Sequence, residues 1–172
     1  MAKPLLEIIR ERRSIRAYRD RPIEPAQLDG LIQALICAPS SGNFQCRRFF
    51  FVRSGELIRR IAAACFDHAW IATAPLVVVA CRDDRIDEHY GPGSARFAIQ
   101  DVSASIQNLL LAAHACGLGS CWVCAFDEGG LERLLGLPPQ YHPVALVTVG
   151  YPAEEPPVPG RVAPHEAVVW LD

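Results

Sequence analysis

The sequence contains the uninterrupted apolar run Leu76-Val77-Val78-Val79-Ala80-Cys81, which is bounded by Pro75 and Arg82. A short apolar run of this kind, rich in β-branched residues, is typical of a strand. Strands with both faces covered show continuous apolar sequence instead of an alternating pattern. We therefore predict that residues 76–81 form a central strand of a sheet.

Segments on both sides of this run show further strand and helix patterns. Predicted helices cover residues 4–12, 25–38, 57–65, 95–116 and 131–135. Predicted strands cover residues 49–52, 118–124 and 144–149, and the first of them, with three phenylalanines, is expected to be buried. Because helices alternate with strands, the pattern predicts an α/β or an α+β fold. The Gly- and Pro-containing loop 83–93 is expected to be the most flexible segment. The proline-rich tail 151–172 is expected to run extended along a surface.

The helix predicted at 95–116 is apolar around much of its circumference, and Gly117 is expected to close it. Its apolar positions include Ile99, Val102, Ile106, Leu109, Leu110, Ala113 and Cys116. A helix that is apolar over a wide arc is either buried deeply or packed against a partner subunit.

The overall composition favours one globular unit, residues 1–172, over two. About half of the residues are hydrophobic (51%), and the net charge of −2 gives no general attraction to nucleic acid. No apolar run approaches the ~20 residues of a membrane-spanning helix. The first residues do not resemble a signal peptide, and the seven cysteines show no disulfide spacing, so we expect a reducing cytoplasm.

Two polar segments contain the side chains best suited to binding a ligand. The first is Arg12-Arg13-Ser14-Ile15-Arg16, where guanidinium groups could grip a phosphate through paired hydrogen bonds. The second is Ala38-Pro39-Ser40-Ser41-Gly42-Asn43-Phe44-Gln45, a turn whose side-chain amides suit the edge of a flat heterocycle. Together they indicate a site for a phosphorylated heterocyclic cofactor. The alternatives are a solvated arginine cluster, an ordinary turn, and, with less support, a nucleic-acid surface.

Thiol and metal chemistry have weaker support. Cys121 and Cys124 match Cys-x-x-Cys, but on a strand they would point to opposite faces at a separation of ~10 Å, which is too far for a disulfide. No second Cys/His pair supports a zinc site, so we expect no metal. His114 is expected to be a packed residue. Nucleotide-binding glycine motifs are absent from the sequence, so a nicotinamide would dock transiently.

The sequence resembles a short member of the FMN-dependent nitroreductase family. The matching motifs are the two polar segments, the run from Ala74 to Val79, Gln100-Asp101, Leu110 to Phe126, and Val149-Gly150-Tyr151-Pro152. The motifs follow in the right order over nearly the whole chain. The resemblance implies an α+β fold with a central, mainly antiparallel sheet flanked by helices, and an intertwined homodimer with two FMN molecules at the subunit interface.

The resemblance also assigns residues to the cofactor. It implies that Arg12, Arg13 and Ser14 hold the phosphate and that Arg16 lies near the N1/O2 side of the flavin, where a cation stabilises the reduced ring. It places Pro39, Ser40, Ser41, Asn43 and Gln45 at the partner's flavin. The backbone around Val123, Cys124 and Ala125 would face the ring, with Trp122 beside it or in the core.

The sequence departs from the family pattern at several positions. Gln45-Cys46-Arg47 stands where Gln-Pro-Trp is common, and Cys124 stands where Gly is common. An Asn and a Lys that longer members carry before the central strand have no clear counterpart. The C-terminal basic pair is reduced to Arg161, which is therefore the remaining candidate for a second phosphate contact.

The implied activity is that of an FMN oxidoreductase that passes electrons from NAD(P)H to a small acceptor such as a nitroaromatic, a quinone or a free flavin, by a ping-pong mechanism. Because the flavin carries the chemistry, no catalytic side chain is predicted. Alternatives with the same fold are a reductive dehalogenase, an enzyme that degrades its own flavin, and a non-catalytic FMN-binding protein. A thiol oxidoreductase would depend on Cys121. No membrane or nucleic-acid partner is expected.

Overall fold

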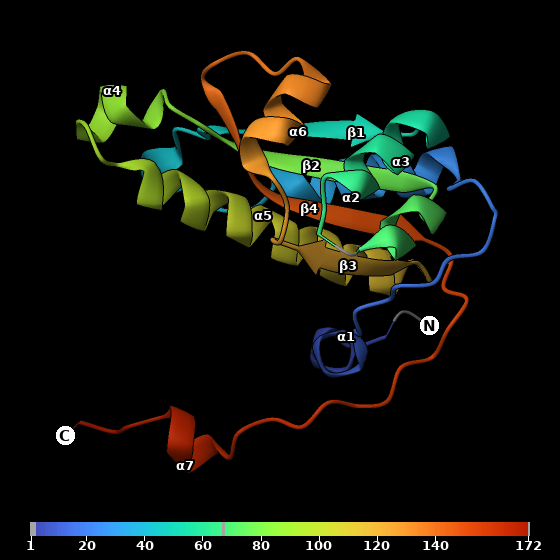
Figure 1. Cartoon of the computed structure of the whole chain (residues 1–172). Coiled ribbons are helices and arrows are strands. Elements are labelled where there is room, and N and C mark those ends of the chain that lie inside the picture. Colours follow the sequence, from blue (N-terminus) through green and yellow to red (C-terminus); the bar gives the residue numbers. More distant parts are fainter. Residues whose placement is uncertain (1–2, 67, 172) are drawn as a thin grey trace.

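One four-stranded antiparallel sheet forms the centre of the protein, in the order β1-β2-β4-β3 (Figure 1). This computed structural model describes residues 3–66 and 68–171. The strands are β1 (Arg47–Val52), β2 (Leu76–Asp83), β3 (Gly119–Val123) and β4 (Tyr141–Gly150). Because β2 pairs on both sides and residues 76–81 are buried, the predicted central strand is confirmed.

The predicted helices are also confirmed within a few residues. The helices are α1 (Leu5–Glu11), α2 (Pro25–Ile36), α3 (Gly55–Ala63), α4 (Ile86–Tyr90), α5 (Ala95–Ala115), α6 (Glu128–Leu135) and α7 (Pro164–Ala167), with 3-10 turns η1 (Ser41–Asn43) and η2 (Ala69–Thr73). Glu24 and Gln27 form a reciprocal capping box at the start of α2. Gly117, with a φ of 76°, ends the α5 region as expected.

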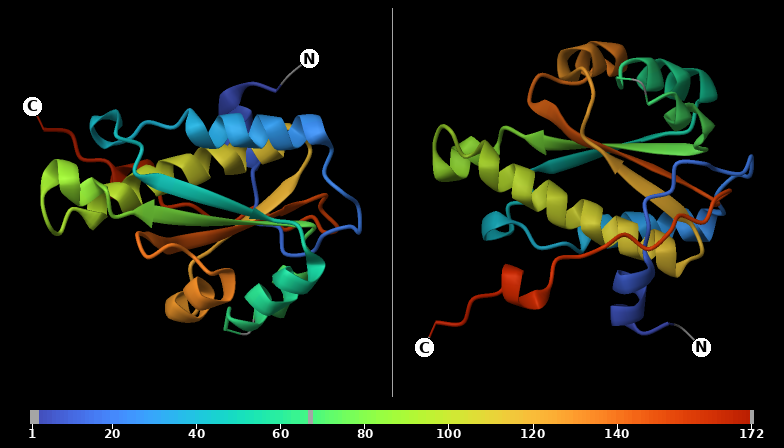
Figure 2. Two further views of the ribbon diagram at one scale, coloured as in Figure 1. Left: turned by 90° about the horizontal axis from the view of Figure 1, so that it is seen from above. Right: turned by 60° about the horizontal axis from the view of Figure 1, so that its bottom comes forward.

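Helices cover both faces of the sheet, as Figure 2 shows, and a hydrophobic core lies on each face. On one face, α3, η2 and α6 cover side chains such as Val77, Val79 and Leu146. On the other, α2 and α5 cover Val78 and Val147. The alternation along β2 explains why its sequence is apolar without interruption, since each side chain enters one core or the other. The fold is therefore α+β with an antiparallel sheet.

The structure corrects two expectations about exposure and order. Phe49, Phe50 and Phe51 were expected to be buried, but β1 is an edge strand and these side chains are only partly covered. The segment predicted to be a flexible loop, 83–93, contains the end of β2 and the helix α4. Periodicity could not reveal α4, because it is only five residues long.

The wide apolar arc of α5 is covered within the chain to a large extent. Its buried side chains face α2 and the sheet, and they include Val102, Ile106 and Leu109. Ile99 remains 41% exposed. Of the two explanations for the arc, deep burial therefore accounts for most of it.

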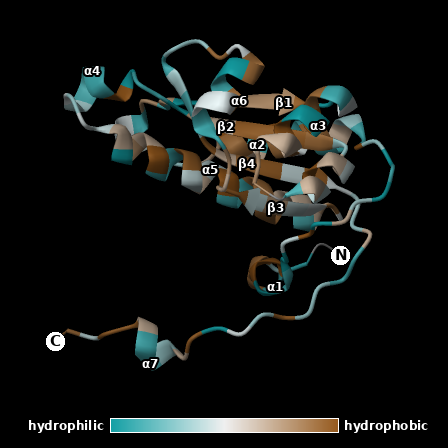
Figure 3. Cartoon of the chain, viewed as in Figure 1, coloured by the Kyte–Doolittle hydropathy of each residue, from teal (hydrophilic) through white to brown (hydrophobic). Residues whose placement is uncertain are grey.

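The tail after β4 is extended, as predicted, but it does not follow the surface to its end. Pro152 still forms an isolated bridge with Tyr18. Further on, the chain leads away from the sheet, and Figure 3 shows apolar residues near its end in the open. Trp170 and Leu171 are 86% and 92% exposed. Among the described helices, none is long and apolar enough to cross a membrane.

Candidate functional site

The Arg12–Arg16 segment is fixed to the edge strand β3. Ser14 and Ser120 form a parallel bridge, and the Ile15 N–H donates to the Ser120 carbonyl at 3.0 Å. A Cβ atom at Gly119 would lie 2.7 Å from the Ile15 side chain, so only glycine permits this close approach. The segment therefore presents its arginines from a defined position beside the sheet.

Arg12, Arg13 and Arg161 form a cluster of positive charge at this edge. Burial, followed by the proximity of Arg161 and Arg13, lowers the pKa of the Arg12 guanidinium. Among the described residues, no carboxylate lies within 4.0 Å of these three guanidinium groups. A half-buried cation that is repelled by its neighbours fits a phosphate, whose negative charge would offset much of the positive charge of the three guanidinium groups.

Arg16 lies at the other end of the segment. Its backbone N–H donates to the Glu154 carboxylate, and its guanidinium carbon lies 5.9 Å from the centroid of the Trp70 ring on η2. An exposed guanidinium near an aromatic ring leaves room for a second flat group at its open side. The sequence pattern alone did not indicate a role for Trp70.

Val123 and Cys124 stand where β3 ends, next to this cationic edge. Val123 is buried, Cys124 is exposed, and the buried Nε1 of Trp122 has no hydrogen-bond partner among the described residues. Burial raises the pKa of the Cys121 thiol. Cys121 and Cys124 are both free thiols, as expected from their places on the strand and beyond it.

The second polar segment is held by Arg47, whose role the sequence did not reveal. Arg47, which is buried, donates to the carbonyls of Ile36, Ala38 and Pro39 at 3.1, 2.7 and 3.0 Å. It thereby caps α2 and fixes the start of the turn. The departure from the family pattern at this position thus has a structural role, which spacing along the sequence could not show.

The backbone of this segment has positive φ values at three of the four positions from 42 to 45. Gly42, Asn43 and Gln45 have φ values of 55°, 57° and 56°. Left-handed backbone at residues other than glycine is uncommon and is often found at functional sites. The Gln45 N–H donates to the Ser40 hydroxyl at 3.2 Å, which helps to hold the turn.

Both polar segments contact α5, but at opposite ends. Ser41 bonds to Asp101 near the start of the helix, and His114 near its end lies 3.7 Å from Glu11, beside the arginine segment. Thirteen residues of helix correspond to about 20 Å. The structure therefore places Arg12, Arg13 and Ser14 beside the start of β3, with Arg161 near Arg12, and Val123 and Cys124 at and beyond the far end of that strand. Pro39, Ser40, Ser41, Asn43 and Gln45 lie near the other end of α5.

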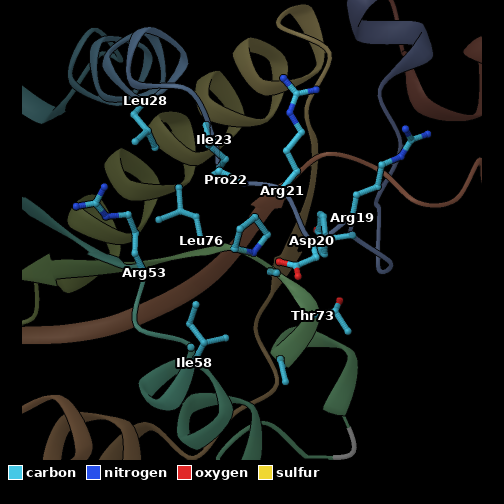
Figure 4. Close-up of a pocket in the computed structure, with 15 residues that line it drawn as sticks. Arg19, Asp20, Arg21, Pro22, Ile23, Leu28, Arg53, Ile58, Thr73 and Leu76 are labelled. Atoms are coloured by element: carbon cyan, nitrogen blue, oxygen red, sulfur yellow. The ribbon is translucent and has the colours of Figure 1, made fainter.

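A cavity of about 590 Å³ lies elsewhere, between β2, α3 and the segment 18–23 (Figure 4). Its floor is apolar, with Ile58 and Leu76, and none of the predicted cofactor residues lines it. The side chains of Arg19 and Arg53 at its rim point outward in Figure 4. A second cavity, of about 480 Å³, is the one that Arg12 and Arg13 line.

Comparisons with known proteins show the family of the chain. The model of the nitroreductase family matches residues 9–86 and 66–151. A Methanothermobacter thermautotrophicus protein named as an NADH dehydrogenase/NAD(P)H nitroreductase is 34% identical, over 88% of this chain and 79% of the relative. A 5,6-dimethylbenzimidazole synthase from Rhodospirillum rubrum is 31% identical, over 86% and 82%. The structure of the NADPH:FMN oxidoreductase from Vibrio harveyi, complexed with NAD+, superposes with a TM-score of 0.89 at 26% identity, covering 98% of this chain and 77% of that one.

Proposed function

The chain belongs to the nitroreductase family, and we propose that it is an FMN-dependent oxidoreductase that uses NAD(P)H to reduce a small acceptor. The observation that carries this proposal is the arginine segment held beside β3, where Arg12, Arg13 and Arg161 have no carboxylate within 4.0 Å in the described part of the chain. When bound, FMN supplies hydride acceptance from NAD(P)H and electron donation to the acceptor.

The residues of the chain would bind and orient the cofactor. Arg12, Ser14 and Arg161 would hold the phosphate, with Arg13 beside them, and Arg16 would place positive charge near the N1/O2 side of the ring. Val123 and Cys124 would line the ring from the end of β3. These assignments rest on the fit between a charge cluster without counter-ions and a dianionic phosphate.

We propose that a second copy of the chain completes the site. Within one chain, the Pro39–Gln45 segment lies about 20 Å along α5 from the arginine segment. A second copy related by two-fold symmetry could bring its own Pro39, Ser40, Ser41, Asn43 and Gln45 to this flavin. The exposed apolar residues of α1, among them Leu5 and Leu6 at 63% and 65%, support a partner on this side, because no residue of α1 is buried within the chain.

Nitroaromatics, quinones and free flavins are the proposed acceptors. One exposed ring face would serve NAD(P)H and the acceptor in turn, which predicts ping-pong kinetics. The test mixes the oxidised holoprotein with NADPH or NADH without oxygen and then adds a quinone. We expect the flavin absorption to bleach and to return, and double-reciprocal plots to be parallel. A flavin that NAD(P)H does not bleach would instead indicate an FMN carrier.

A second candidate function follows from one of the relatives. The 31% identity to a 5,6-dimethylbenzimidazole synthase matches the flavin-degrading alternative, because that product contains the dimethylbenzene ring that is also part of FMN. The test incubates the reduced holoprotein with oxygen and analyses the mixture by mass spectrometry. Intact FMN would favour the reductase, and released 5,6-dimethylbenzimidazole would favour the synthase.

A further inference from the structure

A cluster of three potential metal ligands lies on the α6 side of the sheet, away from α1 and the tail (Figure 1). Glu128 and Glu132 are one turn apart on α6, and His142 is the second residue of β4. One ligand atom from each residue lies within 4.8 Å of the other two. Residues four apart on a helix share a face, so both carboxylates can turn toward the imidazole.

Both ring nitrogens of His142 face carboxylate oxygens. Its Nδ1 lies 3.0 Å from Glu132 Oε1, and its Nε2 lies 2.9 Å from Asp84 Oδ2. Carboxylates only accept hydrogen bonds, and a neutral imidazole has one N–H. A proton on Nε2 satisfies Asp84 and directs the Nδ1 lone pair at Glu132. That contact is repulsive unless a second proton or a metal ion lies between the two atoms.

Glu128 favours a metal ion over a second proton. Among the described residues, Glu128 has no ion-pair partner, and like charges at i and i+4 on a helix destabilise it. Asp84 is also paired with Arg82, so an imidazolium ion would offer its one positive charge chiefly to Glu128 and Glu132. A divalent cation offers two, and it can bind both carboxylates of α6 directly.

The distances also suit direct coordination. Metal–ligand bonds of 2.0–2.2 Å place neighbouring ligand atoms about 3.0–3.5 Å apart. The His142–Glu132 distance of 3.0 Å is already in this range. Glu128 is exposed, so a rotation of its side chain can bring it into place.

We propose that Glu128, Glu132 and His142 form a binding site for a divalent first-row metal ion, with water in the remaining positions. One imidazole and two carboxylates suit ions such as Mn²⁺ or Zn²⁺. Asp84 is a positioning residue that orients the ring through Nε2, and it is itself paired with Arg82. The site joins α6 to the sheet. The spacing of Cys and His residues could not indicate this site, because its ligands come from two elements and include a single histidine.

The experiment titrates Mn²⁺ into chelator-dialysed, FMN-loaded protein and follows free Mn²⁺ by EPR. Mn²⁺ is the probe because the free cysteines, which bind zinc, bind it poorly. We expect one Mn²⁺ per chain. Glu132→Gln and His142→Gln should weaken binding at least tenfold, and Asp84→Ala on the order of tenfold. Glu56→Gln, at an exposed glutamate on α3, is the matched control.

Glu128→Gln distinguishes the loss of a metal ligand from misfolding, because Glu128 is exposed and does not pack in the core. It should weaken Mn²⁺ binding while leaving the metal-free melting temperature unchanged. The proposal is overturned if the wild-type protein binds neither Mn²⁺ nor competing Zn²⁺ at this site, or if the ligand variants bind Mn²⁺ as well as Glu56→Gln does. The second proton on His142 would then be the explanation for its two contacts.

Discussion

Ser41 donates two hydrogen bonds to a single carboxylate oxygen of Asp101, from its backbone N–H at 2.9 Å and from its hydroxyl at 3.0 Å. Asp101 is buried near the start of α5, and its second carboxylate oxygen has no partner among the described residues. The contact joins the left-handed Gly42–Gln45 turn to the longest helix of the fold. The turn is thus positioned by a residue about 60 positions further along the chain.

Replacing Asp101 should loosen this turn. Asp101→Ala leaves the Ser41 donors without their acceptor, and we expect a loss of about 1–3 kcal/mol in the free energy of unfolding. Urea denaturation measures this loss. Asp101→Asn keeps an accepting oxygen and should cost less. Equal losses in the two variants would show that the charge of Asp101, and not its acceptor geometry, matters.

Replacing Arg12 should weaken cofactor binding. A charge-assisted hydrogen bond contributes about 1.5–3 kcal/mol, so Arg12→Ala should raise the FMN dissociation constant roughly 10- to 150-fold. Fluorescence titration of the apoprotein measures this constant. Arg53→Ala, at the rim of the 590 Å³ cavity, is the control and should leave the constant unchanged. An Arg12→Ala protein that keeps all its FMN through dialysis would refute the phosphate assignment.

Cys121 should be dispensable for turnover. Its thiol is buried in β3, and burial raises its pKa, so the reactive thiolate is scarce at neutral pH. We expect Cys121→Ser to retain nearly the wild-type rate of quinone-dependent NAD(P)H oxidation. A selective loss of that rate, with FMN still bound, would support the thiol oxidoreductase alternative.

Two buried thiols should make the protein less stable in alkali. Burial raises the pKa of Cys65 from 9.0 to about 11 and that of Cys81 from 9.0 to about 12. Above pH 9 the unfolded chain releases these protons while the folded chain retains them. Stability is therefore fully present below pH 9 and falls as the pH rises toward 11–12, by up to about 1.4 kcal/mol per pH unit for each thiol.

The measurement is the free energy of unfolding of wild type and Cys81→Ala between pH 8 and pH 10.5. The variant should be less stable at pH 8 because of its cavity, yet its stability should fall less steeply above pH 9. Cys37→Ala, at an exposed cysteine, serves as the control with the wild-type slope. Identical slopes for Cys81→Ala and wild type would show that the Cys81 thiol does not ionise on unfolding in this range.

The sequence predicts the elements of this fold well where their patterns are long. The run 76–81 and the helix 95–116 are confirmed because burial of many side chains dictates their apolar patterns. The exposure of β1 was missed, since its phenylalanines look the same on an edge strand as on a central one. The short helix α4 was missed because five residues carry too little periodicity.

The site is predictable only in part, for a different reason. Residues within one segment, such as Arg12 and Ser14, can be identified from their spacing, and the family resemblance implies a role for them. Arg47 and Asp101 act through contacts with other segments of the chain. Arg161 comes from near the C-terminal end of the sequence, and its charge lowers the pKa of Arg12. Such pairings depend on tertiary structure, which neither composition nor spacing contains.

The central claim is that two copies of this chain enclose FMN through the arginines of the β3 edge. The most direct measurement is the mass of the purified protein in solution by light scattering, together with identification of the chromophore that heat or acid releases. We predict a yellow dimer that releases one FMN per chain. A colourless monomer of 18.9 kDa that takes up no added FMN would contradict the account.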